Sequence, residues 1–207
     1  MDLDKNLDKN SPFTIKKLNG RGGSFLVVPV DKGEVFSREM FSDDHVMFQN
    51  AALEFANNRI RPVYKDLNVM NSELSKELFK EVGQLGFLGV DIPEKYGGLD
   101  LDKTTSCIIL DSLSCGKSAS FMVTLSAHTG IGSLPLIWYG NEDQNKKYLS
   151  KIASGEYMAC FALTEPNAGS DAMAGTTTAS LNEEGTHYIL NGQKIYCTNG
   201  SWSDVCI

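Results

Sequence analysis

Two short polar stretches carry the side chains that are best suited to hold a ligand. The first is A-L-T-E-P-N-A-G-S-D at 162–171, and the second is Y-C-T-N-G at 196–200. Each offers a hydroxyl group, backbone N–H groups and a glycine that lets a ligand approach the main chain closely. These donors suit a phosphate and the edge of a flat heterocycle. A plain turn is the alternative for the first stretch, because Pro, Asn, Gly, Ser and Asp also form turns.

The elements that position these stretches begin with a helical region. Apolar residues recur at three- and four-residue spacing, which predicts helices over about 42–66, 72–85, 103–115, 118–129, 135–140 and 141–153. Ser42 and Ser72 are the predicted N-caps of the first two helices. Asn141 with Gln144 forms a predicted capping box, and Gly155 ends the last helix. The 118–129 segment carries no charged residue, which predicts burial on nearly every face.

The hydrophobic period changes from 3.6 to 2 after Gly155, which predicts β-structure in the rest of the chain. We expect strands over 157–163 and 176–180, then a hairpin with a type I′ turn at Asn191-Gly192. A last strand begins at Ser203 and has no evident partner within the chain. At the other end, 25–30 is a possible edge strand in an extension over 1–40.

Composition excludes several classes of protein. A net charge of −7 and a pI near 5.0 argue against nucleic-acid binding, which needs a basic surface. The acidic N-terminus lacks the features of secretory and mitochondrial leaders, and the sequence predicts no membrane span, so we expect a cytoplasmic protein. The five cysteines show no metal-ligand spacing, so we expect no metal site and interpret the cysteines as buried free thiols.

The order of these motifs resembles the acyl-CoA dehydrogenase family of flavoproteins. The resemblance rests on T-E-P-x-A-G-S-D after a helical region, on Asn-Gly-x-Lys-x-x-x-Thr-Asn-Gly, and on S-A-H-T-G-I-G-S-L-P-L at 126–136. It covers about 41–207. It implies an α+β fold in which an all-α helical bundle (41–156) precedes the first strands of a β-barrel-like middle domain (157–207). A C-terminal helical domain of the family would be absent.

The resemblance also implies roles for individual residues. Thr164 would bond the pyrimidine side of the isoalloxazine ring of FAD, Leu163 would pack on it, and Gly169 and Ser170 would approach the pyrophosphate. The second stretch would place donors near flavin O4 and N5. The full set of implied FAD contacts is Phe161, Leu163, Thr164, Gly169, Ser170, Tyr196, Cys197 and Thr198. Ser170, Val123 and Ala127 would contact the acyl-CoA.

The implied activity is oxidation of an acyl-CoA to the trans-2-enoyl-CoA, in the breakdown of fatty-acid or amino-acid-derived acyl-CoA. An electron-transferring flavoprotein would reoxidise the enzyme, which would be a homodimer or homotetramer. Two alternatives stay open: an acyl-CoA oxidase or flavin monooxygenase of the same fold, and a non-catalytic binding module. The family's catalytic base is a Glu in its C-terminal part. The chain alone is therefore expected to bind FAD weakly or not at all, and to be inactive.

The remaining titratable residues have plainer interpretations. We expect His128 to be a hydrogen-bonded residue at a helix end, because no carboxylate lies at triad-like spacing. His45 and His187 are interpreted as surface residues, and the family resemblance implies that Glu165 is structural. Lys146-Lys147 is interpreted as a solvated helix face.

Overall fold

The computed structural model describes residues 37–207, which fall into two compact units, one ending at Val46 and the other spanning Met47–Ile207. The described part of the first unit contains a 3-10 turn (Arg38–Met40) and the start of helix α2 (Asp43–Phe55). The Ser42 hydroxyl accepts a hydrogen bond from the His45 N–H at 3.2 Å, which confirms the predicted N-cap. The possible edge strand at 25–30 lies outside the described residues.

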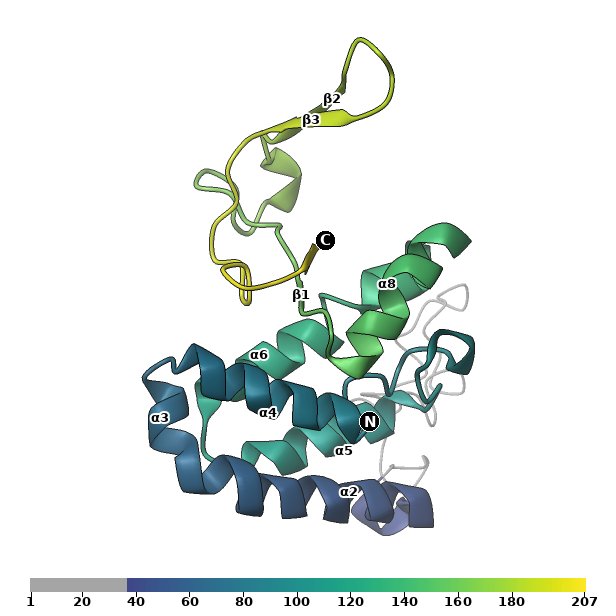
Figure 1. Ribbon diagram of the computed structural model, residues 1–207, viewed down its shortest axis with the longest axis vertical. Coiled ribbons are helices and arrows are strands. Elements are labelled where there is room, and N and C mark those ends of the chain that lie inside the picture. The colour runs from purple at the N-terminus through teal and green to yellow at the C-terminus, as the bar shows by residue number, and fades with distance from the viewer. Residues whose placement is uncertain (1–36) are drawn as a thin grey trace, which may run out of the picture. The chain divides into compact units, whose positions relative to one another are not determined.

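The second unit continues as a series of helices (Figure 1). Pro62 lies in a 3-10 turn between α2 and α3, and a proline cannot donate the N–H that a continuous helix needs. The predicted helix over 42–66 is therefore interrupted. The helices after α2 are α3 (Tyr64–Asn68), α4 (Ser72–Gln84), α5 (Lys103–Ser114), α6 (Ala119–Thr129), α7 (Leu134–Tyr139) and α8 (Glu142–Ser154).

Local capping explains where these helices start and stop. Asn141 and Gln144 form the predicted capping box at the start of α8, and Gly155 ends that helix at a positive φ of 74°. The predicted cap of α4 is wrong by one residue. Asn71 is the N-cap, because its Oδ1 accepts from the Leu74 N–H at 3.2 Å, and Ser72 is the first helical residue.

Two hydrophobic clusters hold the second unit together. The larger one joins α2 to α6 and includes the buried side chains of Leu78, Phe79 and Phe121. The smaller one joins α8 to two short strands through Leu149, Ile152, Ala159, Val205 and their neighbours. The β-segment is therefore packed directly on the helices at one end.

Helix α6 is not buried on every face, which corrects the expectation from its charge-free sequence. Val123 is 51% exposed, whereas Phe121, Leu125 and His128 are buried. By length and composition alone, residues 119–139 could cross a membrane. In the structure this stretch is divided into α6 and α7, and both helices contribute side chains to the hydrophobic clusters.

The cysteines are also more exposed than expected. All five are free thiols, but only Cys160 is buried, Cys197 is partly buried, and Cys107, Cys115 and Cys206 are exposed.

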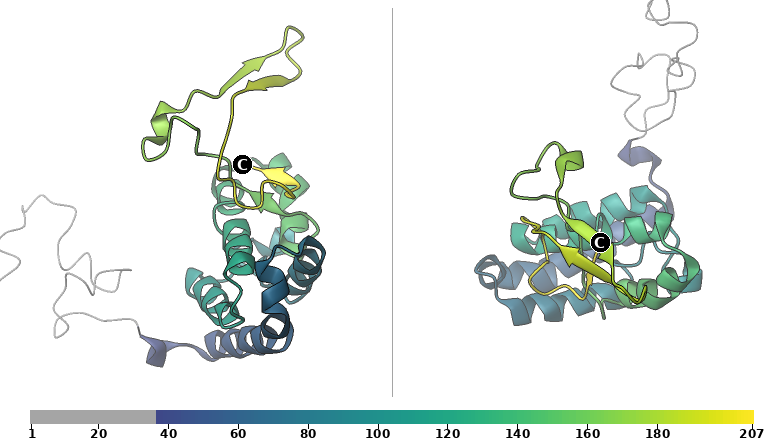
Figure 2. Two further views of the ribbon diagram at one scale, coloured as in Figure 1. Left: turned by 90° about the vertical axis from the view of Figure 1, so that its left-hand side faces the viewer. Right: turned by 90° about the horizontal axis from the view of Figure 1, so that it is seen from above.

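The predicted hairpin turn at Asn191-Gly192 is wrong. Strand β3 (Tyr188–Asn191) pairs antiparallel with β2 (Thr178–Leu181), and the connecting turn lies at 182–187. The Asn182 side chain builds this turn by accepting from the N–H groups of Thr186 and His187 at 2.9 and 3.0 Å. Gly192 is needed for close packing, because a Cβ at that position would clash with the Thr177 side chain. The β2–β3 hairpin extends away from the helices and is exposed along both strands (Figures 1 and 2).

The last strand does have a partner within the chain, contrary to the expectation from the sequence. Strand β4 (Val205–Cys206) pairs in parallel with β1 (Ala159–Cys160), with Ala159 opposite Val205. The Ala162 N–H extends the contact by donating to the Ile207 carbonyl at 2.8 Å. Strand β1 is shorter than the predicted 157–163, since only these two residues pair as a strand.

His128 joins the helices to β1. Its imidazole is fully buried, Nδ1 accepts from the Ala159 N–H at 3.0 Å, and Nε2 lies 3.1 Å from the Ile152 carbonyl oxygen. Nδ1 must be unprotonated to accept, so Nε2 carries the proton and donates to Ile152. This bonding confirms the structural interpretation of His128. Burial lowers the pKa of His128 to about 4.

Folding stability should therefore fall in mild acid. The unfolded chain binds a proton at His128 near its ordinary pKa of 6.5, whereas the folded chain does so only near 4, so stability is complete above pH 6.5 and is lost as the pH falls toward 4. We expect a loss of about 3 kcal/mol over this window, measured as the free energy of unfolding in urea. His128→Gln, which cannot titrate, should remove this slope, whereas the exposed-site variant His187→Gln should keep it. An unchanged slope in His128→Gln would contradict the assignment.

Candidate ligand-binding site

The structure brings the two predicted polar stretches side by side. The Ile195 N–H donates to the Thr164 carbonyl at 2.8 Å, and the Lys194 ammonium donates to the Leu163 carbonyl at 3.0 Å. The first stretch follows β1 and the second precedes β4, so the pairing of these strands carries the two stretches to the same place. Thr164 and Tyr196 therefore belong to one site.

This site is rich in hydrogen-bond donors that are not used within the protein. Within residues 37–207, no protein acceptor bonds the N–H groups of Thr164, Gly169, Ser170, Cys197 and Thr198 or the hydroxyls of Thr164, Ser170 and Thr198. Gly169 is exposed, and a Cβ built on it meets no atom within 4 Å. The main chain at Gly169 is therefore open to a ligand.

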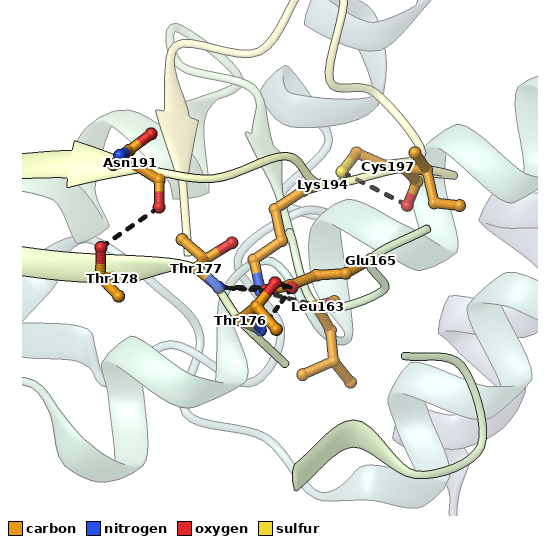
Figure 3. Close-up of polar contacts among 9 residues, drawn as sticks. Leu163, Glu165, Thr176, Thr177, Thr178, Asn191, Lys194 and Cys197 are labelled. Atoms are coloured by element: carbon orange, nitrogen blue, oxygen red, sulfur yellow. Dashed lines mark hydrogen bonds and ion pairs between the residues drawn. The ribbon is translucent and has the colours of Figure 1, made fainter. Parts of the chain in front are cut away.

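Glu165 holds the first stretch in shape. Its carboxylate accepts from the Thr176 N–H at 2.6 Å, from the Thr177 N–H at 3.1 Å and from the Lys194 ammonium at 2.8 Å (Figure 3). The side chain is only 4% exposed. The hydrogen bond from Lys194, followed by those from the two threonines, holds the pKa of Glu165 well below its usual range. Glu165 is thus a permanent anion with a structural role, as the family resemblance implied.

The second stretch is held in an unusual backbone conformation. Tyr196 has φ of 57° and Asn199 has φ of 69°, and both are non-glycine residues in the left-handed region. Asn199 is 6% exposed, and its amide donates to the carbonyls of Thr124 on α6 and Ala159 on β1 at 3.0 and 3.3 Å. Tyr196 is 88% exposed and has no comparable anchor among these bonds. Such strain tends to be kept where it presents functional groups, here Cys197 and Thr198.

Two hollows border the second stretch. Cys197 and Thr198 line a cavity of about 540 Å³, whose other walls include Phe121, Thr124 and Trp202. Tyr196 and Cys197 line a second hollow of about 470 Å³ that also contacts Ala162. The predicted ligand contacts of the first stretch, namely Phe161, Leu163, Thr164, Gly169 and Ser170, line neither of these two hollows.

The two α6 residues expected at an acyl group lie elsewhere. Val123 is on the exposed side of the helix, and Ala127 is buried, with its carbonyl accepting from the Gly132 N–H at 2.8 Å. Neither side chain lines the 540 Å³ cavity, where α6 contributes Ser120, Phe121 and Thr124.

Sequence reasoning assigned no role to Lys194 or Asn199, although both lie within the quoted second motif. Their positions relative to Thr198 could have indicated a role, because Lys194 precedes Thr198 by four residues and Asn199 follows Thr198 directly. Their partners could not be recognised, since they lie about thirty and forty residues earlier in the chain.

A helical unit followed by paired polar loops with open donors defines a ligand-binding protein of the α+β class. Comparison with known proteins makes this specific. The N-terminal domain of acyl-CoA dehydrogenase matches residues 42–156, and the middle domain of acyl-CoA dehydrogenase matches residues 160–207. The chain belongs to the acyl-CoA dehydrogenase family.

Individual relatives agree with this family. A probable acyl-CoA dehydrogenase of Bacillus subtilis (strain 168) is 44% identical over 187 residues, which are 90% of this chain and 31% of the relative. The crystal structure of an acyl-CoA dehydrogenase complexed with FAD from Bacillus anthracis superposes with a TM-score of 0.83 and 47% identity, covering 90% of this chain and 32% of that one. A glutaryl-coenzyme A dehydrogenase in complex with glutaryl-CoA gives a TM-score of 0.73 and 32% identity, covering 84% of this chain and 43% of that one. The chain thus spans less than half the length of these relatives.

Asn199 should be critical for the shape of the second stretch. Asn199→Ala removes two hydrogen bonds and places an alanine at a positive φ, so we expect a loss of roughly 2–4 kcal/mol in the free energy of unfolding. Asn199→Gly removes the same bonds without the conformational penalty and should lose about 1 kcal/mol less than the alanine variant. Chemical denaturation measures both. Equal losses in the two variants would show that the backbone at Asn199 is not strained.

Proposed function

We propose that the chain forms part of the FAD-binding site of an acyl-CoA dehydrogenase that oxidises acyl-CoA to trans-2-enoyl-CoA. The observation that carries the proposal is the set of open N–H and hydroxyl donors on two adjoining loops. The isoalloxazine edge and the pyrophosphate of FAD present the matching acceptors. The FAD bound to the Bacillus anthracis relative supports the choice of cofactor.

The residues present fit this cofactor. Thr164 and Thr198 offer a hydroxyl and an N–H each for the ring, and the open main chain at Gly169 and Ser170 suits a phosphate. Phe161, Leu163, Tyr196 and Cys197 complete the proposed contacts. When bound, FAD supplies the capacity to take up two electrons from the acyl group. The donors of this chain would stabilise negative charge on the cofactor, as an oxyanion hole does.

The acyl-CoA would meet the chain at Ser170 and along α6. Ser170 is exposed, and its unpaired hydroxyl suits a polar part of the thioester ligand. Val123 presents an exposed apolar side chain to the acyl group. Ala127 is buried, so its proposed contact with the acyl group would be made from inside the protein. The complex of glutaryl-CoA with a relative supports an acyl-CoA ligand.

The wider setting of the enzyme is proposed on the family resemblance and on the sequence. We place it in the cytoplasm, in the breakdown of fatty-acid or amino-acid-derived acyl-CoA. It would act as a homodimer or homotetramer that passes electrons to an electron-transferring flavoprotein. A chain that matches at 35% identity occurs in a solved structure of the electron transferring flavoprotein of Acidaminococcus fermentans, which supports this acceptor.

The threonine donors give a direct test of cofactor binding. Thr164→Ala and Thr198→Ala each remove one hydroxyl donor, and each should weaken FAD binding by about threefold to tenfold, since such a bond contributes roughly 0.5–1.5 kcal/mol. Flavin fluorescence during titration of a full-length enzyme that contains this chain measures the affinity. Thr186→Ala, in the exposed β2–β3 turn, is the matched control and should bind FAD as the parent does. Unchanged affinity in both site variants would count against the assignment.

The chain by itself should not turn over an acyl-CoA. The buried histidine and the buried carboxylate near the site, His128 and Glu165, are both committed to structural hydrogen bonds and cannot serve as the base. We therefore expect no acyl-CoA oxidation in the presence of FAD and an artificial electron acceptor. Turnover with the acceptor would show that the base lies within this chain, and turnover with oxygen alone would favour the oxidase alternative.

A further inference from the structure

Lys194 is the link between the two ligand-binding stretches. Its ammonium donates to the Glu165 carboxylate at 2.8 Å and to the Leu163 carbonyl at 3.0 Å (Figure 3). The next residue, Ile195, donates its N–H to the Thr164 carbonyl at 2.8 Å. Two consecutive residues just before the second stretch thus hold two consecutive carbonyls of the first. With its carbonyl held, Thr164 keeps its N–H and hydroxyl for a ligand.

Glu165 fixes the other end of this link. Besides Lys194, its carboxylate takes the Thr176 N–H and hydroxyl at 2.6 and 3.0 Å and the Thr177 N–H at 3.1 Å. Three chain segments therefore meet at one buried carboxylate. The Lys194 side chain is 29% exposed, against 3% for Glu165, so the lysine lies at the more exposed edge of the cluster.

We propose that Lys194 is a positioning residue for the cofactor, which holds Thr164 and Thr198 at the spacing that lets both donors reach the same flavin ring. The proposal rests on the function proposed above. Thr164 precedes Glu165, and Thr198 follows Lys194 by four residues, so a shift at the ion pair moves both donors relative to each other. A small misplacement of the binding groups is enough to weaken the binding of a ligand that needs several hydrogen bonds at once.

The competing explanation is that Lys194 only neutralises a buried carboxylate. The two roles predict different FAD affinities for a double variant in which both partners of the ion pair are replaced by neutral residues. Removing one partner of a buried ion pair is destabilising, whereas replacing both partners by neutral residues is often tolerated. Glu165→Gln combined with Lys194→Met should restore folding stability, but methionine cannot donate to the Leu163 carbonyl. Only the positioning role predicts that the cofactor site stays impaired.

The experiment compares a full-length enzyme that contains this chain, as the parent, with four variants. These are Lys194→Met, Lys194→Arg, the double variant Glu165→Gln/Lys194→Met, and Lys146→Met as control. Lys146 also pairs with a glutamate, Glu142, but on an exposed helix face away from the loops. Each protein is assayed for its urea unfolding midpoint, for FAD affinity by flavin fluorescence, and for hydrogen exchange of the Ile195 amide.

We expect Lys194→Met to unfold at lower urea, to bind FAD about tenfold more weakly and to exchange the Ile195 amide faster. The double variant should regain most of the stability but keep the weak FAD binding and the fast exchange. Lys194→Arg, which still donates to both acceptors, should stay within about threefold of the parent in FAD affinity. Lys146→Met should match the parent throughout.

Two results would overturn the proposal separately from the proposed function. If the double variant regains FAD affinity together with stability, Lys194 only compensates charge. If Lys194→Met leaves both the Ile195 exchange and the FAD affinity unchanged, Lys194 positions nothing. A full-length parent that shows no affinity for FAD at millimolar concentration would instead overturn the cofactor assignment, and the positioning role with it.

Discussion

The buried imidazole of His128 is the contact on which the site depends. It has one proton and two ring nitrogens, and both nitrogens are committed, one to the Ile152 carbonyl on α8 and the other to the Ala159 N–H on β1. An imidazolium could not accept from Ala159, so the arrangement requires the neutral form, which burial enforces. Strand β1 is thereby fixed against the helices. Both ligand-binding stretches are attached to β1, the first because it follows the strand directly and the second through β4.

Asn199 adds a second attachment on the same face of α6. Its amide bonds the Thr124 carbonyl, one helical turn before His128, and the Ala159 carbonyl of β1. Helix α6 therefore carries both polar anchors through side chains and backbone that are buried. A charged residue on this face would compete for the same carbonyls and would have to be desolvated. This explains the absence of charge on the buried face of the helix; the exposed face, at Val123, is under no such constraint.

Local chemistry made the helices predictable, while contacts between distant segments were not. The capping box at Asn141 and the glycine stop at Gly155 need only residues a few positions apart, and both are confirmed. The prediction of the hairpin turn failed because two turn signals compete within fifteen residues. Asn191-Gly192 resembles a type I′ turn, but the Asn182 side chain closes the turn that forms, and Gly192 is needed for its close approach to Thr177. The parallel pairing of β1 with β4 joins segments about 45 residues apart, and nothing in two-residue strands reveals that register.

The titratable groups of the site are arranged to bind rather than to react. A general base must change protonation near the working pH and must reach its substrate. Glu165 fails on both counts, because donors surround its carboxylate and hold its pKa well below the usual range. His128 fails because its lone pair already accepts from the main chain. What the two loops leave free are donors on Thr164, Ser170 and Thr198, and donors favour an acceptor-rich, electron-accepting ligand. A protein that uses its buried acid and its buried histidine to place such donors contributes orientation and electrostatics, while the chemistry belongs to the bound ligand.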